Sequence, residues 1–194
     1  MSAMTKGGNI LKKGKTVKES QVIMAQQMNP HDANPAGNVH GGVIMKLIDT
    51  AAGSVSIRHA RSNAVTASID RLDFHCPVFV GDLVTLKASM NLVGKTSMEI
   101  GVRVEAENLL SGEVRHTASA YLTFVSLDEY GKSKVILPLI LETDEERRRN
   151  HEAKARKEAR MQEKLEEQEQ QNRNKVKLDL VEKIIRKYGE DVKK

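Results

Sequence analysis

The sequence predicts an α+β domain in which a curled antiparallel sheet wraps one long helix, followed by a charged helical extension. Apolar residues recur at helical spacing between His40 and Ala60. Three runs of alternating apolar and polar residues come later and are separated by short turns, a pattern typical of antiparallel strands. The extension is set apart by its charge, because residues 142–194 hold 16 Lys+Arg and 14 Asp+Glu.

The 194 residues fit one domain with an appendage. We expect a flexible leader over 1–15, a folded domain over 16–141, and a helical or partly disordered extension over 142–194. The single cysteine excludes a disulfide framework within one chain and suits a reducing compartment. No stretch is apolar for eighteen residues and the N-terminus lacks an apolar signal region, so we expect no membrane span and a cytoplasmic location.

The folded domain begins with β-branched and apolar positions from Thr16 to Met28, which predict a first strand. Residues 29–38 are dense in Asn, Pro, Asp and Gly, so they predict a structured loop. The helix follows over 40–60, and between Gly41 and Ile57 its only charged residues are Lys46 and Asp49. A surface helix carries a broad polar face, so this composition predicts a largely enclosed helix.

The strands come after this helix. Apolar residues alternate from Val65 to Ile69, and the alternation then shifts parity at Leu72, which predicts a bulge or bend. Residues 84–92 and 98–106 alternate cleanly and are joined by a turn at 93–97. The link 108–112 predicts a further hairpin to a third strand, 117–127.

The extension from Glu142 to Asn174 consists almost entirely of good helix formers with few apolar residues. An exposed helix and a disordered segment both fit this composition. Leu178 to Tyr188 then shows apolar residues at helical spacing and predicts a short amphipathic helix that needs a partner surface.

The glycine pair Gly41-Gly42 at the start of the helix is the first candidate for chemistry. Its backbone N–H groups lie at a positive helix end and could stabilise the oxyanion of an acyl transfer. A tight turn that merely needs glycine is the alternative. His40, just before the pair, fits either a substrate contact or a structural role at the helix start.

Asp49 is the second candidate, because Asp is a poor residue for a helix interior. Its helical neighbours Met45, Ala52 and Gly53 cannot pair with its charge, so a general base is one interpretation and a polar groove or subunit contact the other. No His or Cys has metal-ligand spacing with another, so we expect no metal site. Cys76 fits a packed apolar residue better than a nucleophile.

Together these residues resemble the hotdog-fold acyl-CoA thioesterases, and most closely the cytosolic, brain-type acyl-CoA hydrolases and their bacterial relatives. The resemblance rests on the stretch from Asn34 to Asp49, NPAGNVHGGVIMKLID, and covers roughly residues 16–140. It continues through the segments 58–60, 65–70, 74, 77–78, 81–82, 94–99 and 124–127.

The resemblance implies hydrolysis of acyl-CoA in a site shared between two chains whose helices lie side by side. Asn34 and the N–H of Gly41 or Gly42 come from one chain and Asp49 from the other, which activates water or attacks directly through an anhydride. The division is physically reasonable, because Asp49 lies eight residues beyond Gly41, about 12 Å along its own helix. A dimer would be the minimal active unit, and a trimer of dimers the expected assembly.

The phosphates of coenzyme A call for cationic side chains, and arginine suits bidentate phosphate contacts. The expected CoA-binding residues lie beside the glycine pair, just beyond the helix and in the 94–97 turn: His40, Arg58, Arg61, Thr66, Gly94, Lys95, Thr96 and Ser97. No metal or redox cofactor is expected, because a thioester is already activated for hydrolysis.

Two other functions fit parts of the sequence. A hotdog domain can bind acyl-CoA as a sensor without turnover, since this fold hosts binding and dehydratase members too. A dehydratase would be expected to offer a His-centred site, and His40 is poorly placed for one. Nucleic-acid binding is disfavoured, because the extension is of mixed charge and no aromatic residues interleave with basic ones.

Overall fold

The computed structural model describes residues 14–189, except for the side chains of residues 176 and 180–189. The chain divides into two compact units, one ending at Asn150 and the other beginning at His151. Apart from Gly14 and Lys15, the expected leader lies outside the described residues, and its flexibility stays a prediction. The elements in chain order are β1 (Lys15–Thr16), α1 (Val17–Ser20), β2 (Val22–Gln27), the 3-10 turn η1 (Pro30–Asp32), α2 (Gly41–Ala60), β3 (Asn63–Phe74), β4 (Leu83–Val93), β5 (Ser97–Asn108), β6 (Glu113–Leu127), β7 (Leu139–Ile140) and α3 (Asp144–Gly189).

The expected first strand is wrong at its start, where the chain forms the short helix α1 instead. The Thr16 N–H donates to Glu19 Oε2 at 2.9 Å, and the Glu19 N–H donates to Thr16 Oγ1 at 3.3 Å. This reciprocal capping box satisfies donors that a helix start otherwise leaves free. The strand itself begins only at Val22.

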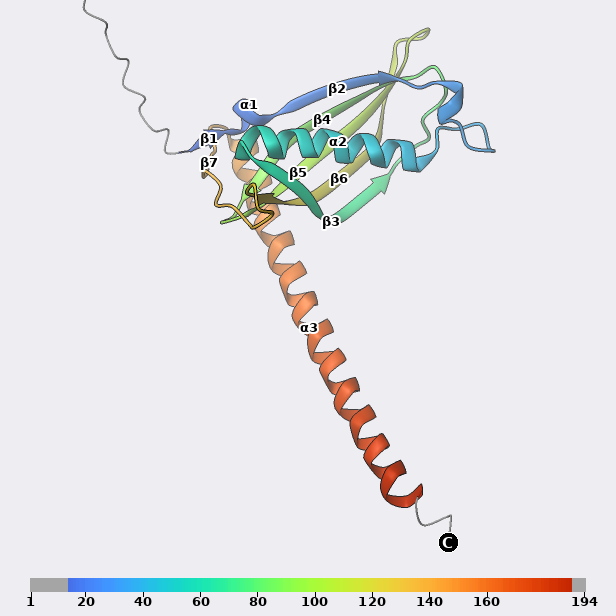
Figure 1. Cartoon of the computed structure of the whole chain (residues 1–194). Coiled ribbons are helices and arrows are strands. Elements are labelled where there is room, and N and C mark those ends of the chain that lie inside the picture. The colour runs from blue at the N-terminus through green and yellow to red at the C-terminus, as the bar shows by residue number, and fades with distance from the viewer. Residues whose placement is uncertain (1–13, 190–194) are drawn as a thin grey trace, which may run out of the picture. The chain divides into compact units, whose positions relative to one another are not determined.

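Five strands form one antiparallel sheet in the order β2-β4-β5-β6-β3, with α2 packed across it (Figure 1). The strands β4, β5 and β6 are joined by hairpins, as the short turns predict. Among the described strands, β3 pairs only with β6 and β2 only with β4, so these two strands form the edges of the sheet. A separate pair, β1 and β7, joins the two ends of the folded unit in parallel register.

The parity shift in β3 does mark an irregular strand. Its register with β6 slips twice, between Thr66 and Ser68 and between Ile69 and Arg71. Such bulges bend a strand and turn its side chains, so the side chain of Thr66 is placed at a bend beside α2.

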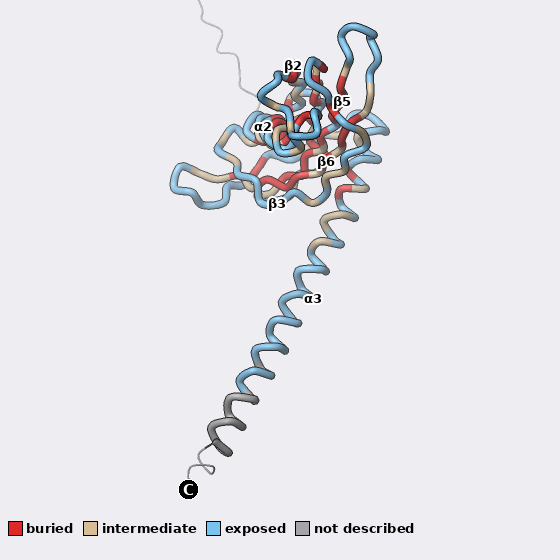
Figure 2. The backbone as a smooth tube through the Cα atoms, turned by 90° about the vertical axis from the view of Figure 1, so that its right-hand side faces the viewer, coloured by how far each residue is buried: buried red, intermediate tan, exposed pale blue. Residues whose placement is uncertain are grey.

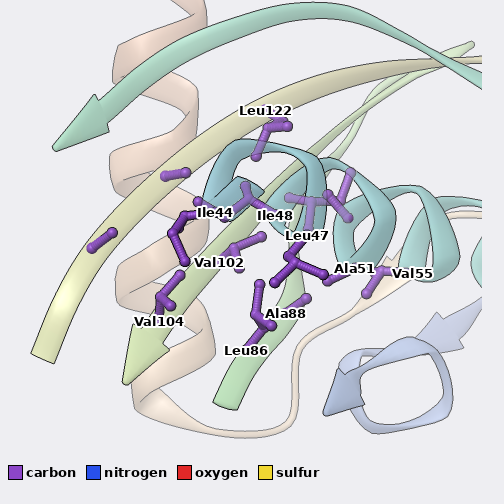
Figure 3. Close-up of a cluster of buried hydrophobic side chains, with 14 of the residues drawn as sticks. Ile44, Leu47, Ile48, Ala51, Val55, Leu86, Ala88, Val102, Val104 and Leu122 are labelled. Carbon is purple, nitrogen blue, oxygen red and sulfur yellow. The ribbon is translucent and has the colours of Figure 1, made fainter. Parts of the chain in front are cut away.

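The core lies between α2 and the sheet. Figure 3 shows α2 side chains meeting strand side chains from β4, β5 and β6, and Figure 2 shows the buried residues gathered at the same layer. The labelled core residues are Ile44, Leu47, Ile48, Ala51 and Val55 on the helix, and Leu86, Ala88, Val102, Val104 and Leu122 on the sheet. Each large aliphatic side chain buried here stabilises the fold by about 1.5–3 kcal/mol.

The opposite face of α2 is not enclosed within one chain, which contradicts the expectation of a largely enclosed helix. Met45 and Ile57 are exposed there, as are Lys46 and Thr50. The low charge of this helix therefore does not arise from burial inside its own subunit.

Two residues set the ends of α2. His40 caps the N-terminus, since the Gly42 N–H donates to its Nδ1 at 2.9 Å. Arg61 ends the helix in the left-handed conformation, with φ 51° and ψ 41°, a conformation that usually favours glycine. Among the described residues it is the only one besides glycine with positive φ.

The extension is helical over α3 where the structure describes it. The first turns of α3 belong to the folded unit: the Asn150 side-chain amide donates to the Asn91 carbonyl at 2.7 Å, and Arg149 Nη1 contacts Ser89 Oγ at 3.3 Å. Most side chains of the expected amphipathic segment, Leu178 to Tyr188, lie outside the described residues. Over the described part of the chain, no helix is both long and apolar enough to cross a membrane.

Candidate active site

A cleft of about 310 Å³ opens at the N-terminal end of α2. One wall is the loop before the helix and its first turn, and the other is the end of β3 with the segment after it. The lining residues are Asn34, Asn38, Val39, Gly41, Ile44, Phe74, His75, Cys76, Pro77 and Val78. Two of the residues expected to be catalytic, Asn34 and Gly41, thus meet in one cavity.

Asn34 is oriented by its own loop. Its Oδ1 accepts the N–H of Ala36 at 2.9 Å and that of Asn38 at 3.3 Å, while its backbone N–H donates to the Asn38 carbonyl at 2.7 Å. Gly37 has φ 85° at the tip, a value suited to glycine. With the oxygen turned into the loop, the Nδ2 amide is left as a donor for whatever enters the cleft.

The two glycines are not equivalent. The Gly42 N–H is already bonded to His40 Nδ1, and Gly42 does not line the cleft. The Gly41 N–H has no acceptor in the part of the chain that the structure describes, and Gly41 does line the cleft. His40 thus acts as a helix cap here, which is the structural role that the sequence allowed for it beside a substrate contact. The pattern of donors favours Gly41 as the group that meets an anion.

Asp49 lies elsewhere on α2 and does not line this cleft. Its partner comes from β3 and not from its own helix, because the Thr66 hydroxyl donates to Asp49 Oδ1 at 2.6 Å. Thr66 is one of the expected CoA-binding residues, and in this structure its hydroxyl holds the carboxylate. Within one chain, Asp49 is therefore oriented but separated from Asn34 and Gly41.

The remaining expected CoA-binding residues gather at the other end of α2. Arg58 Nη1 donates to the Gln21 carbonyl at 2.7 Å, and Arg61 follows the helix. The 94–97 turn reaches the same end, because the Ser126 N–H donates to the Thr96 carbonyl at 2.9 Å and Ser126 Oγ contacts Ser62 Oγ at 2.7 Å. This end lies about 25 Å along the helix from Gly41, at 1.5 Å per residue, so one chain does not bring the two sets together.

The sequence did not reveal the groups beside the cleft wall. The His75 and His116 rings lie with their centroids 4.6 Å apart and their planes tilted by 53°. Partial burial together with the charges of Arg103 and His75 lowers the pKa of His116. The Cys76 thiol donates to the His116 carbonyl at 3.3 Å. These contacts join residues some forty positions apart, so no local pattern could have indicated them.

Comparisons of the sequence with a family model and with known proteins agree on one family. Residues 36–112 match the model of the thioesterase superfamily. The cytosolic acyl coenzyme A thioester hydrolase of Homo sapiens is 41% identical over 143 residues, covering 73% of this chain and 38% of that protein. The uncharacterized acyl-CoA thioester hydrolase YkhA of Bacillus subtilis is 40% identical over 129 residues, covering 66% of this chain and 75% of that protein. The chain thus spans well under half the length of the human relative.

Solved structures agree in fold. An apo hexameric acyl-CoA thioesterase aligns with a TM-score of 0.75 and 40% identity, over 77% of this chain and 96% of the other. An acyl-CoA hydrolase from Staphylococcus aureus, in complex with butyryl coenzyme A, coenzyme A and coenzyme A disulfide, aligns with a TM-score of 0.74 and 32% identity, over 80% and 94% of the two chains.

The Staphylococcus aureus hydrolase has also been solved with an asparagine, an aspartate and a threonine each replaced by alanine. The spacings between those positions, 15 and 17 residues, equal the spacings between Asn34, Asp49 and Thr66. Sequence, fold and residue spacing agree, and the chain belongs to the thioesterase superfamily of hotdog-fold proteins.

Proposed function

We propose that this chain hydrolyses acyl-CoA thioesters to a free acid and coenzyme A. The observation that carries the proposal is the cleft at the N-terminal end of α2, which Asn34 and Gly41 both line. Two donors at a positive helix end suit the oxygen of a thioester carbonyl, which gains negative charge as the carbonyl carbon is attacked. The human and bacterial relatives, named as acyl-CoA thioester hydrolases, support the same substrate class.

Asp49 of a second copy supplies the base in this proposal. A water molecule loses a proton to the carboxylate as its oxygen attacks the carbonyl carbon, and the resulting oxyanion is held by Asn34 and Gly41. When the tetrahedral intermediate collapses, the carbon–sulfur bond breaks and coenzyme A leaves as the thiolate, which takes up the proton. Direct attack by Asp49, with an anhydride hydrolysed afterwards, is the second route available to the same carboxylate.

The pairing of two chains is part of the proposal. Asp49 and Gly41 of one chain lie too far apart to act on one carbonyl, whereas an antiparallel partner helix brings the two together. The exposed apolar residues Met45 and Ile57 on α2 and the unpaired edge of β3 offer the surface for this contact. We propose a dimer as the active unit and a trimer of dimers as the assembly, which the hexameric relative supports.

In the same dimer, the basic end of the partner helix comes to the cleft, so that Arg58, Arg61 and Lys95 lie within reach of the CoA phosphates. Arg58 and Arg61 can contact phosphate oxygens in bidentate fashion. We propose no metal or redox cofactor for the reaction, and a cytoplasmic location, for which the cytosolic human relative is the support.

Thiol release from a panel of acyl-CoA esters tests the activity. We expect turnover by the wild type and a loss of about 10²–10⁴ in kcat for Asp49→Asn, as for loss of a general base. Asp144→Asn is the matched control, because Asp144 is an exposed carboxylate paired with Arg147 in the first turn of α3. If the folded wild type binds acyl-CoA but releases no thiol, the protein is not a thioesterase, and the acyl-CoA sensor becomes the better interpretation.

Subunit mixing tests the shared site. Asn34→Ala and Asp49→Asn are each expected to keep at most about 1% of the wild-type kcat, but a heterodimer of the two holds one intact site. Random pairing of the two variants should therefore restore about a quarter of the wild-type sites. Mixtures that stay inactive after verified subunit exchange would place Asp49 outside a shared site.

A further inference from the structure

Arg115 on β6 holds three groups of one loop at once. Its Nη2 donates to Asp82 Oδ2 at 2.6 Å, and its Nη1 donates to the Pro77 carbonyl at 2.9 Å. Its guanidinium carbon lies 5.0 Å from the centroid of the Phe79 ring, over the ring face. The side chain of Arg115 is 19% exposed and that of Asp82 only 3%, so this ion pair is largely removed from water.

Asp82 completes the closure of the loop 77–82. The same Oδ2 atom accepts the Phe79 N–H at 2.9 Å, and the Asp82 N–H donates to the Phe79 carbonyl at 3.1 Å. The loop is also pinned to the end of β2, because the Met28 N–H donates to the Asp82 carbonyl at 2.9 Å. The loop 77–82 is therefore held by contacts at several points, and the Arg115–Asp82 pair is the charged contact among them.

This loop supports the segment that carries the proposed oxyanion donors. The Val39 N–H donates to the Val78 carbonyl at 2.8 Å, and Asn38 forms a bridge with Phe79. Asn38 in turn binds Asn34, through both its N–H and its carbonyl. Hydrogen bonds and short stretches of backbone thus connect the Arg115 guanidinium, through the loop 77–82, to the Asn34 side chain.

We propose that Arg115 is a positioning residue of the active site, an inference that rests on the proposed thioesterase function. Only a planar guanidinium presents two N–H groups to Pro77 and Asp82 while stacking on an aromatic face. With these contacts in place, Pro77 and Val78 form a fixed wall of the cleft, and the Asn34 amide and the Gly41 N–H keep their relative position. Arg115 itself touches neither substrate nor the reacting atoms.

Kinetics of Arg115→Gln test the proposal, because glutamine can serve Pro77 or Asp82 but not both. We expect kcat to fall at least tenfold with KM changed less than threefold, since a displacement of about 1 Å at an active site can reduce the rate about 10²-fold. Arg103→Gln is the matched control, because Arg103 lies on the same sheet but pairs with Glu105 and not with the loop 77–82. Arg115→Lys keeps the charge opposite Asp82 and should fold with an intermediate loss of kcat.

A double variant separates positioning from general damage. If Arg115 acts through Asn34, then Arg115→Gln should lower kcat by less than threefold in an Asn34→Ala background. A loss as large in that background as in the wild type would overturn the proposal, and so would wild-type kcat in both Arg115→Gln and Arg115→Lys.

Hydrogen exchange provides a readout that does not need turnover. Peptides covering residues 33–41 should exchange faster in Arg115→Gln than in the wild type or in Arg103→Gln. Unchanged exchange over these residues would contradict the proposed connection, whatever the enzyme's activity. If the exchange changes but the wild type hydrolyses no acyl-CoA, the proposed function fails while the structural connection stands.

Discussion

The Thr66 hydroxyl donates a hydrogen bond of 2.6 Å to Asp49 Oδ1 and so joins the edge strand β3 to the middle of α2. This bond occupies one lone pair of one carboxylate oxygen and leaves Oδ2 free to accept a proton. It also restricts the rotation of the Asp49 side chain, whose helical neighbours offer no other hold. The arrangement resembles the way a catalytic base is oriented by a third group.

Removing the Thr66 hydroxyl should lower activity without unfolding the protein. We expect Thr66→Val to reduce kcat by about tenfold and to cost about 1 kcal/mol of stability, as for loss of one hydrogen bond. Thr66→Ser keeps the donor and should stay near the wild type. Equal activity of the valine and serine variants would show that the bond does not orient the base.

The variant Asn34→Asp should distinguish the structural role of the Asn34 Oδ1 acceptor from the proposed catalytic role of its Nδ2 donor. The carboxylate can still accept the N–H groups of Ala36 and Asn38, so the loop should keep its shape. The Nδ2 donor is lost, and a negative charge faces the developing oxyanion, so kcat should fall by about 10²–10³, as for loss of an oxyanion donor. Circular dichroism and hydrogen exchange over 33–41 would verify the loop. An Asn34→Asp variant with wild-type kcat would exclude the amide as a donor.

Acid should destabilise the fold through His59. This ring is buried, its Nε2–H donates to the Leu137 carbonyl at 3.0 Å, and its Nδ1 accepts from Ser20 Oγ at 2.8 Å. Burial, opposed by the Leu137 bond and assisted by the Lys15 charge, lowers the pKa of His59 from its ordinary value of 6.5. Below that pH the unfolded chain binds a proton that the folded chain does not, so stability falls as the pH falls towards the lowered pKa.

Urea unfolding at pH 7.5 and pH 5.5 measures this effect. The wild type should lose up to about 1.4 kcal/mol per pH unit from this group. The variant His59→Gln should start less stable but lose less on acidification. His31→Gln, at an exposed histidine, is the control and should keep the wild-type dependence. The same pH dependence in His59→Gln would assign the acid sensitivity to other groups.

Gly101→Ala should destabilise the sheet where β4 and β5 meet. A Cβ at Gly101 would lie 2.7 Å from Asn91 Nδ2 and 3.3 Å from its Oδ1. Asn91 is buried and cannot withdraw into solvent, so we expect a loss of about 1–3 kcal/mol. Combining it with Asn91→Ala should remove the clash, so the two losses should not add. Strict additivity in thermal unfolding would contradict the clash.

Truncation should distinguish the first turns of α3 from the rest of the extension. Ending the chain after Asn150 is expected to leave activity per site unchanged. Ending it after Leu141 also removes the bond from Asn150 to the buried Asn91 carbonyl and should lower stability by a further 1–3 kcal/mol or so. Loss of activity per site in the chain that ends after Asn150, if that chain is folded, would give the extension a catalytic role.

Much of the fold was predictable, because its signals are local. The spacing of Ile44, Leu47 and Ile48 indicated α2, and the parity shift at Leu72 indicated the irregular strand β3. The helix α1 was missed although its Thr16–Glu19 capping box is visible in the sequence, because the β-branched residues around it favoured a strand. The exposed face of α2 was missed for another reason: low charge indicates contact with something, but not whether the same chain provides it.

The site was predictable only in part. Asn34, Gly41 and Asp49 stand in one continuous stretch whose resemblance to a family is specific. The bond from Thr66 to Asp49 depends on how a bulged strand lies against a helix, and the contacts of Arg115 with Pro77 and Asp82 join residues more than thirty positions apart. Neither geometry leaves a periodic or local trace in the sequence.

Arg61 ends α2 with φ 51°, and that conformation is strained for any residue with a Cβ, by about 1–2 kcal/mol. Glycine at this position would remove the strain, so Arg61→Gly should raise the melting temperature while deleting a cation from the helix end. A cation at a helix C-terminus contributes only about 0.3–1 kcal/mol, which is less than this strain, so the stability of the helix does not explain the arginine. An arginine that strains the backbone at this position must serve some purpose other than the stability of its own subunit. The proposed contact of Arg61 with a CoA phosphate is such a purpose.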